Sequence, residues 1–280
     1  MPIIQLVGQS KVLEVRQPLI MGILNITPDS YFSQSRVQSI DQALKMADEM
    51  INEGAHILDI GGQSSRPGSE RITSTEELQR VLPIITAIRA HFPDIWISVD
   101  TYYADVANAC IDAGVEIVND ISFGEDDPKM LSVIANKDIT YIGMHKKGDP
   151  KTMQENTQYN SVVDEVFEYL KKRSSNFTAS GVRNIWIDPG FGFGKSIEQN
   201  YALFSQLDQF CQSDFGVLVG ISRKSMIYKL LEINPEDSLN ATSALNLLAL
   251  QKGAKILRVH DVKAANEVLK LHAALHNFAQ

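Results

Sequence analysis

Residues 185–195 read Ile-Trp-Ile-Asp-Pro-Gly-Phe-Gly-Phe-Gly-Lys, and this stretch contains the repeating unit of the whole chain. Ile185–Ile187 predicts a short buried strand, because the segment is apolar and partly β-branched. Asp188 ends the strand, and the proline and glycines after it stop regular structure and let the backbone approach a ligand closely. The unit therefore brings an acid, a loop with two phenylalanines that we expect to be exposed, and a cation at Lys195 to one edge of a sheet.

The same order of strand, polar strand end and helix occurs eight times along the chain. The predicted strands are Ile20–Leu24, His56–Leu58, Ile95–Val99, Glu116–Val118, Ile139–Met144, Ile185–Ile187, Val217–Ile221 and Lys255–Leu257. Eight such units in a chain of this length predict a (β/α)₈ TIM barrel, formed by residues 1–280 as a single domain, with an N-terminal β-hairpin over residues 1–19. The main alternative is an open doubly wound sheet, which normally uses fewer strands and reverses their order.

Helix starts are marked by capping boxes, in which Ser or Thr is followed three residues later by Glu or Gln. Three pairs fit this pattern: Ser39 with Gln42, Ser74 with Glu77, and Ser196 with Gln199. Each pair precedes apolar residues at helical spacing, so we expect a helix to begin at each.

The composition limits the classes of partner. The net charge of −8 argues against nucleic acid or an anionic membrane as the main partner. Cys110 and Cys211 make no metal-binding spacing and are expected to be buried free thiols in a reducing compartment. Residues 1–19 lack a signal pattern and no apolar run is long enough to span a bilayer, so we expect a cytoplasmic location.

Polar residues at the strand ends predict the active site, because loops that follow the strands of this barrel share one face. Any one of these residues could simply be a polar group that is hydrogen-bonded at the end of its strand, but this explanation accounts poorly for the whole set. The set is Asn25, Asp59, Ser65, Arg66, Asp100, Asn119, His145, Asp188, Ser222, Lys224, Arg258 and His260.

This set divides into two groups by charge. Its cations and Ser65 favour a phosphate or diphosphate, which Arg binds bidentately and Lys binds as a point charge. Asp100, Asn119 and Asp188 together match the alternating donors and acceptors of a planar heterocycle. Zinc is not expected, because Asn25-Ile26-Thr27 stands where a metal hydrolase has two histidines.

The motifs at these strand ends resemble those of the dihydropteroate synthase family of pterin-binding enzymes, and the matches run in order through nearly the whole chain. The matching stretches are 21–30, 59–68, 98–101, 119–121, 188–195, 222–225 and 258–262. The resemblance implies condensation of 6-hydroxymethyl-7,8-dihydropterin diphosphate with 4-aminobenzoate, a transferase reaction of folate biosynthesis that releases diphosphate. It also implies Mg²⁺, inhibition by sulfonamides and a homodimer.

The resemblance also implies residue roles. Residues expected to bind the pterin are Asp100, Asn119, Met144, Asp188 and Lys224. Those expected to bind the diphosphate are Asn25, Ser65, Arg66, Arg258 and His260, with Asn25 also a ligand of the metal. Those expected to line the 4-aminobenzoate pocket are Arg66, Pro67, Phe193, Ser222 and Lys224. The residues expected to act in catalysis are Asp100, Asp188, Lys224 and Arg258.

This sequence departs from the family pattern in loops near the expected site. Gln63 stands where Glu is usual, Ser65 where Thr is usual, Phe123 where Gly is usual, and the loop 31–36 is atypical. We expect these changes to alter sulfonamide or aminobenzoate affinity more than the chemistry. Two other functions stay open at this stage: a pterin-dependent methyltransferase domain, and a catalytically idle paralogue that serves as a binding subunit.

Overall fold

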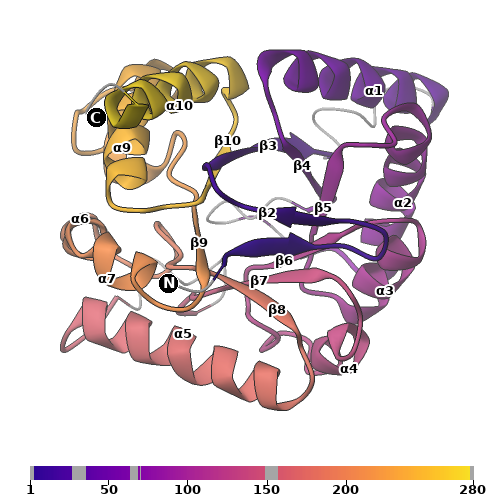
Figure 1. Cartoon of the computed structure of the whole chain (residues 1–280), viewed down its shortest axis with the longest axis horizontal. Coiled ribbons are helices and arrows are strands. Elements are labelled where there is room, and N and C mark those ends of the chain that lie inside the picture. Colours follow the sequence, from indigo (N-terminus) through magenta and orange to yellow (C-terminus); the bar gives the residue numbers. More distant parts are fainter. Residues whose placement is uncertain (1–2, 27–35, 64–68, 70, 149–156, 278–280) are drawn as a thin grey trace.

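A computed structural model describes residues 3–26, 36–63, 69, 71–148 and 157–277 of the chain. In this part of the chain, eight parallel strands close into a barrel, each paired with the next and the last with the first (Figure 1). The strands are β3 (Leu19–Asn25), β4 (Ile57–Gly61), β5 (Trp96–Asp100), β6 (Ile117–Asp120), β7 (Thr140–Met144), β8 (Asn184–Asp188), β9 (Gly216–Val219) and β10 (Ile256–Val259). The predicted (β/α)₈ barrel is confirmed, and the doubly wound alternative is excluded.

Helices alternate with the strands and surround the barrel (Figure 1). Outward-facing strand residues such as Leu58 and Ile60 join helix residues such as Val81 and Ile85 in one apolar core between the two layers. The helices are α1 (Arg36–Glu53), α2 (Ser74–His91), α3 (Ala104–Asp112), α4 (Met130–Ile134), α5 (Val162–Ala179), α6 (Ile197–Ser205), α7 (Leu207–Cys211), α8 (Ser225–Tyr228), the 3₁₀-helix η2 (Pro235–Ser238), α9 (Leu239–Gln251) and α10 (Val262–Asn277).

The predicted N-terminal hairpin is present as β1 (Gln5–Val7) and β2 (Val12–Glu14). It lies across the end of the barrel at which the strands begin (Figure 1). The backbone carbonyl of Gln5 accepts a hydrogen bond from Trp186 Nε1 over 2.9 Å, and the Val7 amide donates to Thr140 Oγ1 over 2.8 Å. The hairpin therefore covers the barrel end opposite the strand tips.

One of the three predicted capping boxes is confirmed, and two are wrong. Ser196 and Gln199 cap α6 reciprocally, as predicted. The box that opens α2 consists of Thr73 and Glu76, one residue before the predicted pair. Glu77 cannot serve there, because its buried carboxylate accepts a hydrogen bond from Thr101. The first predicted box lies inside α1, which begins at Arg36.

Both cysteines are free thiols, with Cys110 buried and Cys211 partly exposed. None of the helices in the described ranges combines the length and the apolar character that a bilayer crossing requires.

Candidate active site

The carboxyl ends of the strands carry most of the predicted site residues. Strand register aligns Asn25, Gly61, Asp100 and Asn119 across four adjacent strands, because each pairs directly with the next. The other described candidates at or just beyond the strand ends are Met144, Asp188, Ser222, Lys224, Arg258 and His260. The barrel therefore gathers the predicted acids, amides and cations on one face.

Arg258 lies at the centre of an ion network on this face. Its Nε lies 2.5 Å from Asp59 Oδ2 and its Nη2 lies 2.5 Å from Asp100 Oδ2. Burial lowers the pKa of Arg258, but the two carboxylates outweigh burial and raise it above its usual range. Burial raises the pKa of Asp100 to about 7, and the charge of Arg258 opposes that rise. The acids hold the guanidinium in a fixed orientation, which suits it for binding an anion.

Asp59 is the residue of this network to which sequence reasoning assigned no role. It is fully buried, and its Oδ2 also accepts a hydrogen bond from Asn119 Nδ2 over 3.1 Å. Asp59 therefore orients the predicted anion-binding Arg258 and the predicted heterocycle-binding Asn119 together. A signal was available: Asp59 stands two residues after the inward-facing Ile57 and so lies on the same inward face of a buried strand, where a charge needs a partner.

Asp188 and Lys224 form the second charged part of the site. Asp188 Oδ1 accepts a hydrogen bond from the Gly190 amide over 2.7 Å. Burial raises the pKa of Asp188, and the nearby Lys224 opposes the rise. Burial lowers the pKa of Lys224 to about 8, with Asp188 opposing it. Lys224 Nζ donates to the Phe191 carbonyl over 2.6 Å and lies 4.7 Å from the centre of the Phe193 ring.

An apolar wall adjoins these charges. Met144 and Phe193 pack with Tyr102 and Ile121 in a small cluster that is separate from the main core. A planar ring that enters from the strand tips would therefore find apolar side chains beside the carboxylates.

The loop after β8 differs from its predicted form. Phe191 and Phe193 were expected to be exposed, but Phe191 is fully buried and Phe193 is 8% exposed. Three glycines with left-handed φ of +66° to +84°, at positions 190, 192 and 194, turn the loop back toward the barrel. Phe191 consequently packs on Phe204 of α6, with the ring centres 5.8 Å apart.

The loop after β9 is tied to the end of β10. The Ser222 hydroxyl accepts a hydrogen bond from the His260 amide over 3.3 Å, and the Arg223 guanidinium pairs with Asp261 at 2.7 Å. Ser222 is buried, whereas His260 is exposed at the rim. These contacts bring the loop that carries Lys224 beside the strand that carries Arg258.

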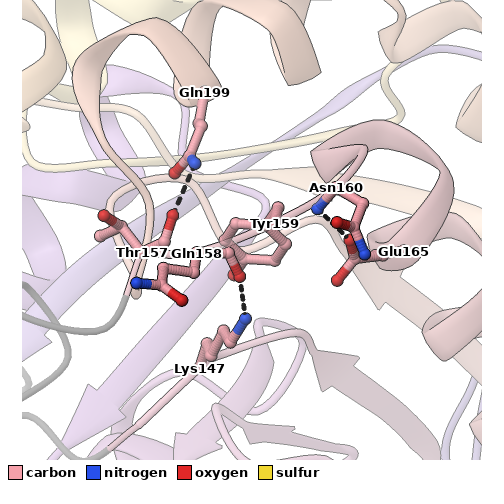
Figure 2. Close-up of a pocket in the computed structure, with 7 residues that line it drawn as sticks. All are labelled: Lys147, Thr157, Gln158, Tyr159, Asn160, Glu165 and Gln199. Atoms are coloured by element: carbon pink, nitrogen blue, oxygen red, sulfur yellow. Dashed lines mark hydrogen bonds between the residues drawn. The ribbon is translucent and has the colours of Figure 1, made fainter.

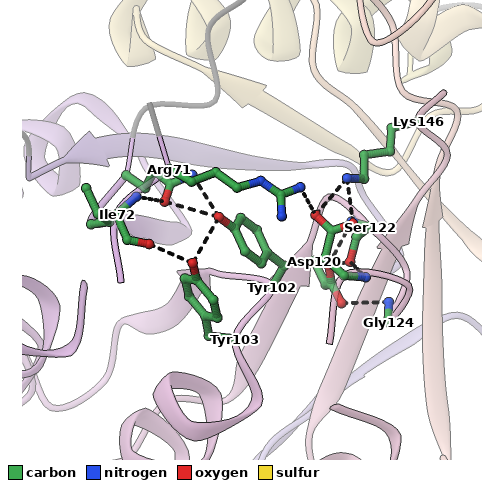
Figure 3. A network of polar contacts seen from close by, with 10 residues as sticks. Arg71, Ile72, Tyr102, Tyr103, Asp120, Ser122, Gly124 and Lys146 are labelled. Carbon is green, nitrogen blue, oxygen red and sulfur yellow. Dashed lines mark hydrogen bonds and ion pairs between the residues drawn. The ribbon is translucent and has the colours of Figure 1, made fainter. Parts of the chain in front are cut away.

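Three predicted residues lie outside the described part of the chain: Ser65, Arg66 and Pro67. The two ends of their loop are held by side chains that follow β5 (Figure 3). Gln63 Oε1 accepts the Ile72 amide over 3.1 Å, and Gln63 Nε2 donates to the Tyr102 hydroxyl over 3.0 Å. Tyr103 donates to the Ile72 carbonyl over 2.6 Å. We call Gln63, Ile72, Tyr102 and Tyr103 the loop clasp.

Ion pairs extend the loop clasp around the rim (Figure 3). Arg71 lies with its guanidinium 5.0 Å from the centre of the Tyr102 ring and pairs with Asp126 at 2.6 Å. Lys146, in the loop after β7, pairs with the same carboxylate at 2.7 Å. The loops after β4, β5, β6 and β7 are therefore linked by polar contacts.

A separate polar hollow of about 570 Å³ lies beyond the end of β7 and includes none of the predicted site residues (Figure 2). Its polar groups are largely paired with one another. Gln199 Nε2 donates to the Thr157 carbonyl over 2.6 Å, and Glu165 Oε1 accepts the Asn160 amide over 2.6 Å. The charges at the strand tips are instead arranged around the barrel axis.

The fold is a (β/α)₈ barrel with charged residues gathered at its strand tips, and a family profile described as "Pterin binding enzyme" matches residues 21–260. The chain is therefore a member of this class of barrel enzymes. The dihydropteroate synthase of Haemophilus influenzae is 42% identical to this chain over 98% of the chain and 99% of that protein. The chain therefore belongs to the dihydropteroate synthase family, which consists of transferases of folate biosynthesis.

Solved structures agree with this assignment. A Yersinia pestis dihydropteroate synthase in complex with a sulfonamide drug has a TM-score of 0.91 and 36% identity, covering 98% of this chain and 100% of that one. The Burkholderia cenocepacia dihydropteroate synthase complexed with 7,8-dihydropteroate has a TM-score of 0.89 and 36% identity, covering 100% and 99%.

Proposed function

We propose that this chain condenses 6-hydroxymethyl-7,8-dihydropterin diphosphate with 4-aminobenzoate, using the charged residues at the strand tips. The observation that carries the proposal is the convergence of Asp100, Asp188, Lys224 and Arg258 on one barrel face. Sulfonamides, which resemble 4-aminobenzoate, would occupy the same pocket.

The pterin binds at the floor of this site. Asp188 and Asp100 accept hydrogen bonds from ring N–H groups, and the Asn119 amide both donates and accepts. Met144 packs against one ring face, consistent with its place in the small apolar cluster. The carboxylates also favour the positive charge that develops on the ring when its bond to the leaving group weakens.

The diphosphate binds nearer the mouth. Arg258 and His260 hold its oxygens, together with Ser65 and Arg66 from the loop whose ends the loop clasp holds. Because Asp59 and Asp100 orient the guanidinium of Arg258, little reorganisation is needed as the leaving group takes up charge.

Mg²⁺ fits the oxygen chemistry of Asn25, a half-buried amide at the end of β3. Gly61 leaves space beside it, since a Cβ there would lie 3.4 Å from Asn25 Oδ1. Within the described ranges, no three His, Cys, Asp or Glu side chains are grouped to hold a metal, so substrate oxygens would supply other ligands. When bound, the ion would neutralise part of the negative charge of the diphosphate.

The reaction breaks the pterin CH₂–O bond, and the electron pair leaves with diphosphate. The amine of 4-aminobenzoate then forms the C–N bond and loses a proton to water or diphosphate. Phe193, Ser222 and Lys224, with Arg66 and Pro67, position this weak nucleophile. No covalent enzyme intermediate is required.

Release of diphosphate from purified protein tests the proposal. With Mg²⁺ and both substrates, dihydropteroate and diphosphate should form in equal amounts, and omission of 4-aminobenzoate should abolish both. Binding of both substrates without product would favour the idle paralogue. Methyl transfer from a folate to a corrinoid protein would favour the methyltransferase. We also propose that the protein is a homodimer and that it is located in the cytoplasm. Sedimentation would check the first statement and cell fractionation the second.

A further inference from the structure

Lys195 is a buried cation that the proposed chemistry does not use. Its side chain is 2% exposed, although lysine is almost never fully buried unless its charge is paired. It follows the loop after β8 and precedes α6. The sequence predicts that Lys195 adds a cation at the edge of the site, but its side chain turns into the protein.

The ammonium of Lys195 lies within hydrogen-bonding distance of acceptors in two loops, the one after β7 and the one after β8. Its Nζ donates to the Gly190 carbonyl over 2.8 Å, to the Phe193 carbonyl over 3.2 Å and to the His145 carbonyl over 3.4 Å. It also lies 3.0 Å from His145 Nδ1. An ammonium has three N–H donors and no acceptor, so the four acceptors share three hydrogens, and the ring nitrogen beside it can only accept, which requires a neutral imidazole. Burial and the charge of Lys195 both lower the pKa of His145, to about 2.

The carbonyls that Lys195 holds belong to the loop that contacts Lys224. The glycines at 190, 192 and 194 have left-handed backbone conformations, so the carbonyls of this loop do not pair within a helix or strand and need other partners. Its Phe191 carbonyl accepts from Lys224, and its Phe193 ring lies beneath the Lys224 ammonium. Any displacement of the loop therefore moves two direct contacts of Lys224.

The same loop is held from its other side by Asn200 of α6. Asn200 Oδ1 accepts the Gly192 amide over 2.7 Å, and its Nδ2 donates to the Lys195 carbonyl over 3.2 Å. Asn200 is also buried and carries no charge. It offers an independent way to loosen the loop without changing the local electrostatics.

Charged and titratable groups surround Lys195 on several sides. Asp188 favours its protonated form and Lys224 opposes it, while burial is the largest influence and lowers the pKa of Lys195 to about 7. From the loop after β7, His145 is neutral and Lys147 adds a further positive charge near that imidazole. Tyr159 donates to the Gly194 carbonyl. The hold on the loop is therefore strongest below about pH 7 and weakens as pH rises through that value.

We propose that Lys195 is a positioning residue that fixes the loop 189–194 and, through it, places Lys224 and Phe193 for the pterin and 4-aminobenzoate. This assignment rests on the proposed function of Lys224.

Amide hydrogen exchange on the substrate-free protein tests the first step. Lys195→Met keeps the length of the side chain and removes the ammonium, so amides of residues 190–194 should exchange about tenfold faster. Lys172→Met, which removes an exposed charge from α5, should leave this loop unchanged. Unchanged exchange in Lys195→Met would overturn the proposal, and this result does not depend on catalytic activity.

A double-mutant cycle tests the link to Lys224. Calorimetry would measure the dissociation constant of the pterin substrate. Lys195→Met should raise it about fivefold in the wild-type background and less than about twofold when Lys224→Met is also present. Equal losses in the two backgrounds would show that Lys195 does not act through Lys224.

Further controls separate the possible failures. If Lys195→Met does not fold, Asn200→Ala should give the same loop exchange and the same dependence on Lys224, and its failure to do so overturns the proposal. The alkaline decline of kcat/KM should also begin at higher pH in Lys195→Met than in wild type, because one titrating cation is gone. An absence of diphosphate release by the wild type, with altered loop exchange in the variant, would reject the proposed function alone.

Discussion

The two ends of the barrel each contain a cluster of buried charge, but the clusters are built differently. At the end covered by the hairpin, the polar contacts of the Glu116 carboxylate with described residues are all with donors. Arg89 Nη2 lies 2.7 Å from its carboxylate, Lys11 Nζ lies 2.9 Å away, and the Ile97 amide donates over 2.8 Å. A single acid with three donors is fully paired within the protein.

The cluster at the strand tips is not fully paired. Arg258 pairs directly with Asp59 and Asp100, whereas Lys224 and Lys195 influence Asp188 as nearby charges. Asp59 Oδ1 is buried with no hydrogen-bond partner among the described residues. Several pKa values at this end are displaced by burial, as is common where a protein prepares groups for a ligand. Charge at the hairpin end is therefore paired within the protein, whereas charge at the strand tips keeps a buried acceptor without a partner among the described residues. Under the proposed function, this second cluster binds the substrates.

Asp188→Asn should give the largest effect. Pterin affinity should fall by about a hundredfold, because two ring N–H donors would meet an amide with one acceptor. Thermal stability should fall, because the buried Lys224 and Lys195 would lose a nearby carboxylate that favours their charged forms. Calorimetry and thermal denaturation check both, with the exposed Asp138→Asn as the control. Pterin binding at the wild-type level would remove Asp188 from the floor of the site.

Arg258→Ala should weaken binding of the pterin diphosphate at least about tenfold more than binding of the diphosphate-free pterin alcohol. The variant should also lose stability, because Asp59 and Asp100 would be left buried without their cation. Titration of each ligand checks the difference. Equal weakening of the two ligands would place Arg258 outside the diphosphate contacts.

Glu116→Gln, at the other end of the barrel, should lower stability while leaving catalysis nearly unchanged. The isosteric amide keeps the shape but loses the charge that pairs with Arg89 and Lys11, so the free energy of unfolding should fall by about 2–4 kcal/mol. Well below the unfolding temperature, kcat/KM should change less than about twofold, since stability and catalysis lie at opposite ends of this fold. Urea denaturation and steady-state kinetics check the two parts. A comparable loss of activity in fully folded protein would break the division between the barrel ends.

The loop clasp offers a smaller test. Gln63→Leu removes the acceptor of the Ile72 amide and should raise KM for 4-aminobenzoate about fivefold. Gln63→Glu restores the residue usual in the family and should stay near wild type, because a carboxylate can accept from both Ile72 and Tyr102. An equal rise in both variants would mean that the hydrogen bond accepted from Ile72 does not govern this KM.

The pH dependence should show the smallest effect. Burial lowers the pKa of Lys224 to about 8, so its cation is present below that pH and is lost as pH rises through it. Affinity for the pterin diphosphate should therefore fall a few-fold between about pH 7 and 9. Lys224→Arg keeps its charge in this range and should remove most of that decline. An unchanged decline would assign it to another group.

Local patterns predicted the barrel well because each strand and helix carries its own signal. Apolar runs such as Ile185–Ile187 ended in polar residues, and the closed barrel requires that all such ends share one face. The α2 cap was misplaced by one residue because Ser74 and Glu77 fit the same pattern as Thr73 and Glu76. Only the burial of Glu77 beside Thr101 distinguishes them.

The amino-acid sequence by itself determined the number and order of the strands, the polar residues at their ends and the family. These depend on short-range periodicity and on motifs that can be compared residue by residue. Only the tertiary structure decided that Arg258 bridges Asp59 and Asp100, that Phe191 is buried, and that Lys195 turns inward to hold a loop. Both acids lie far from Arg258 in the chain, and Lys195 reaches His145 on a different loop as well as carbonyls of its own loop. A buried charge takes whichever acceptors the packing of the whole barrel brings within reach.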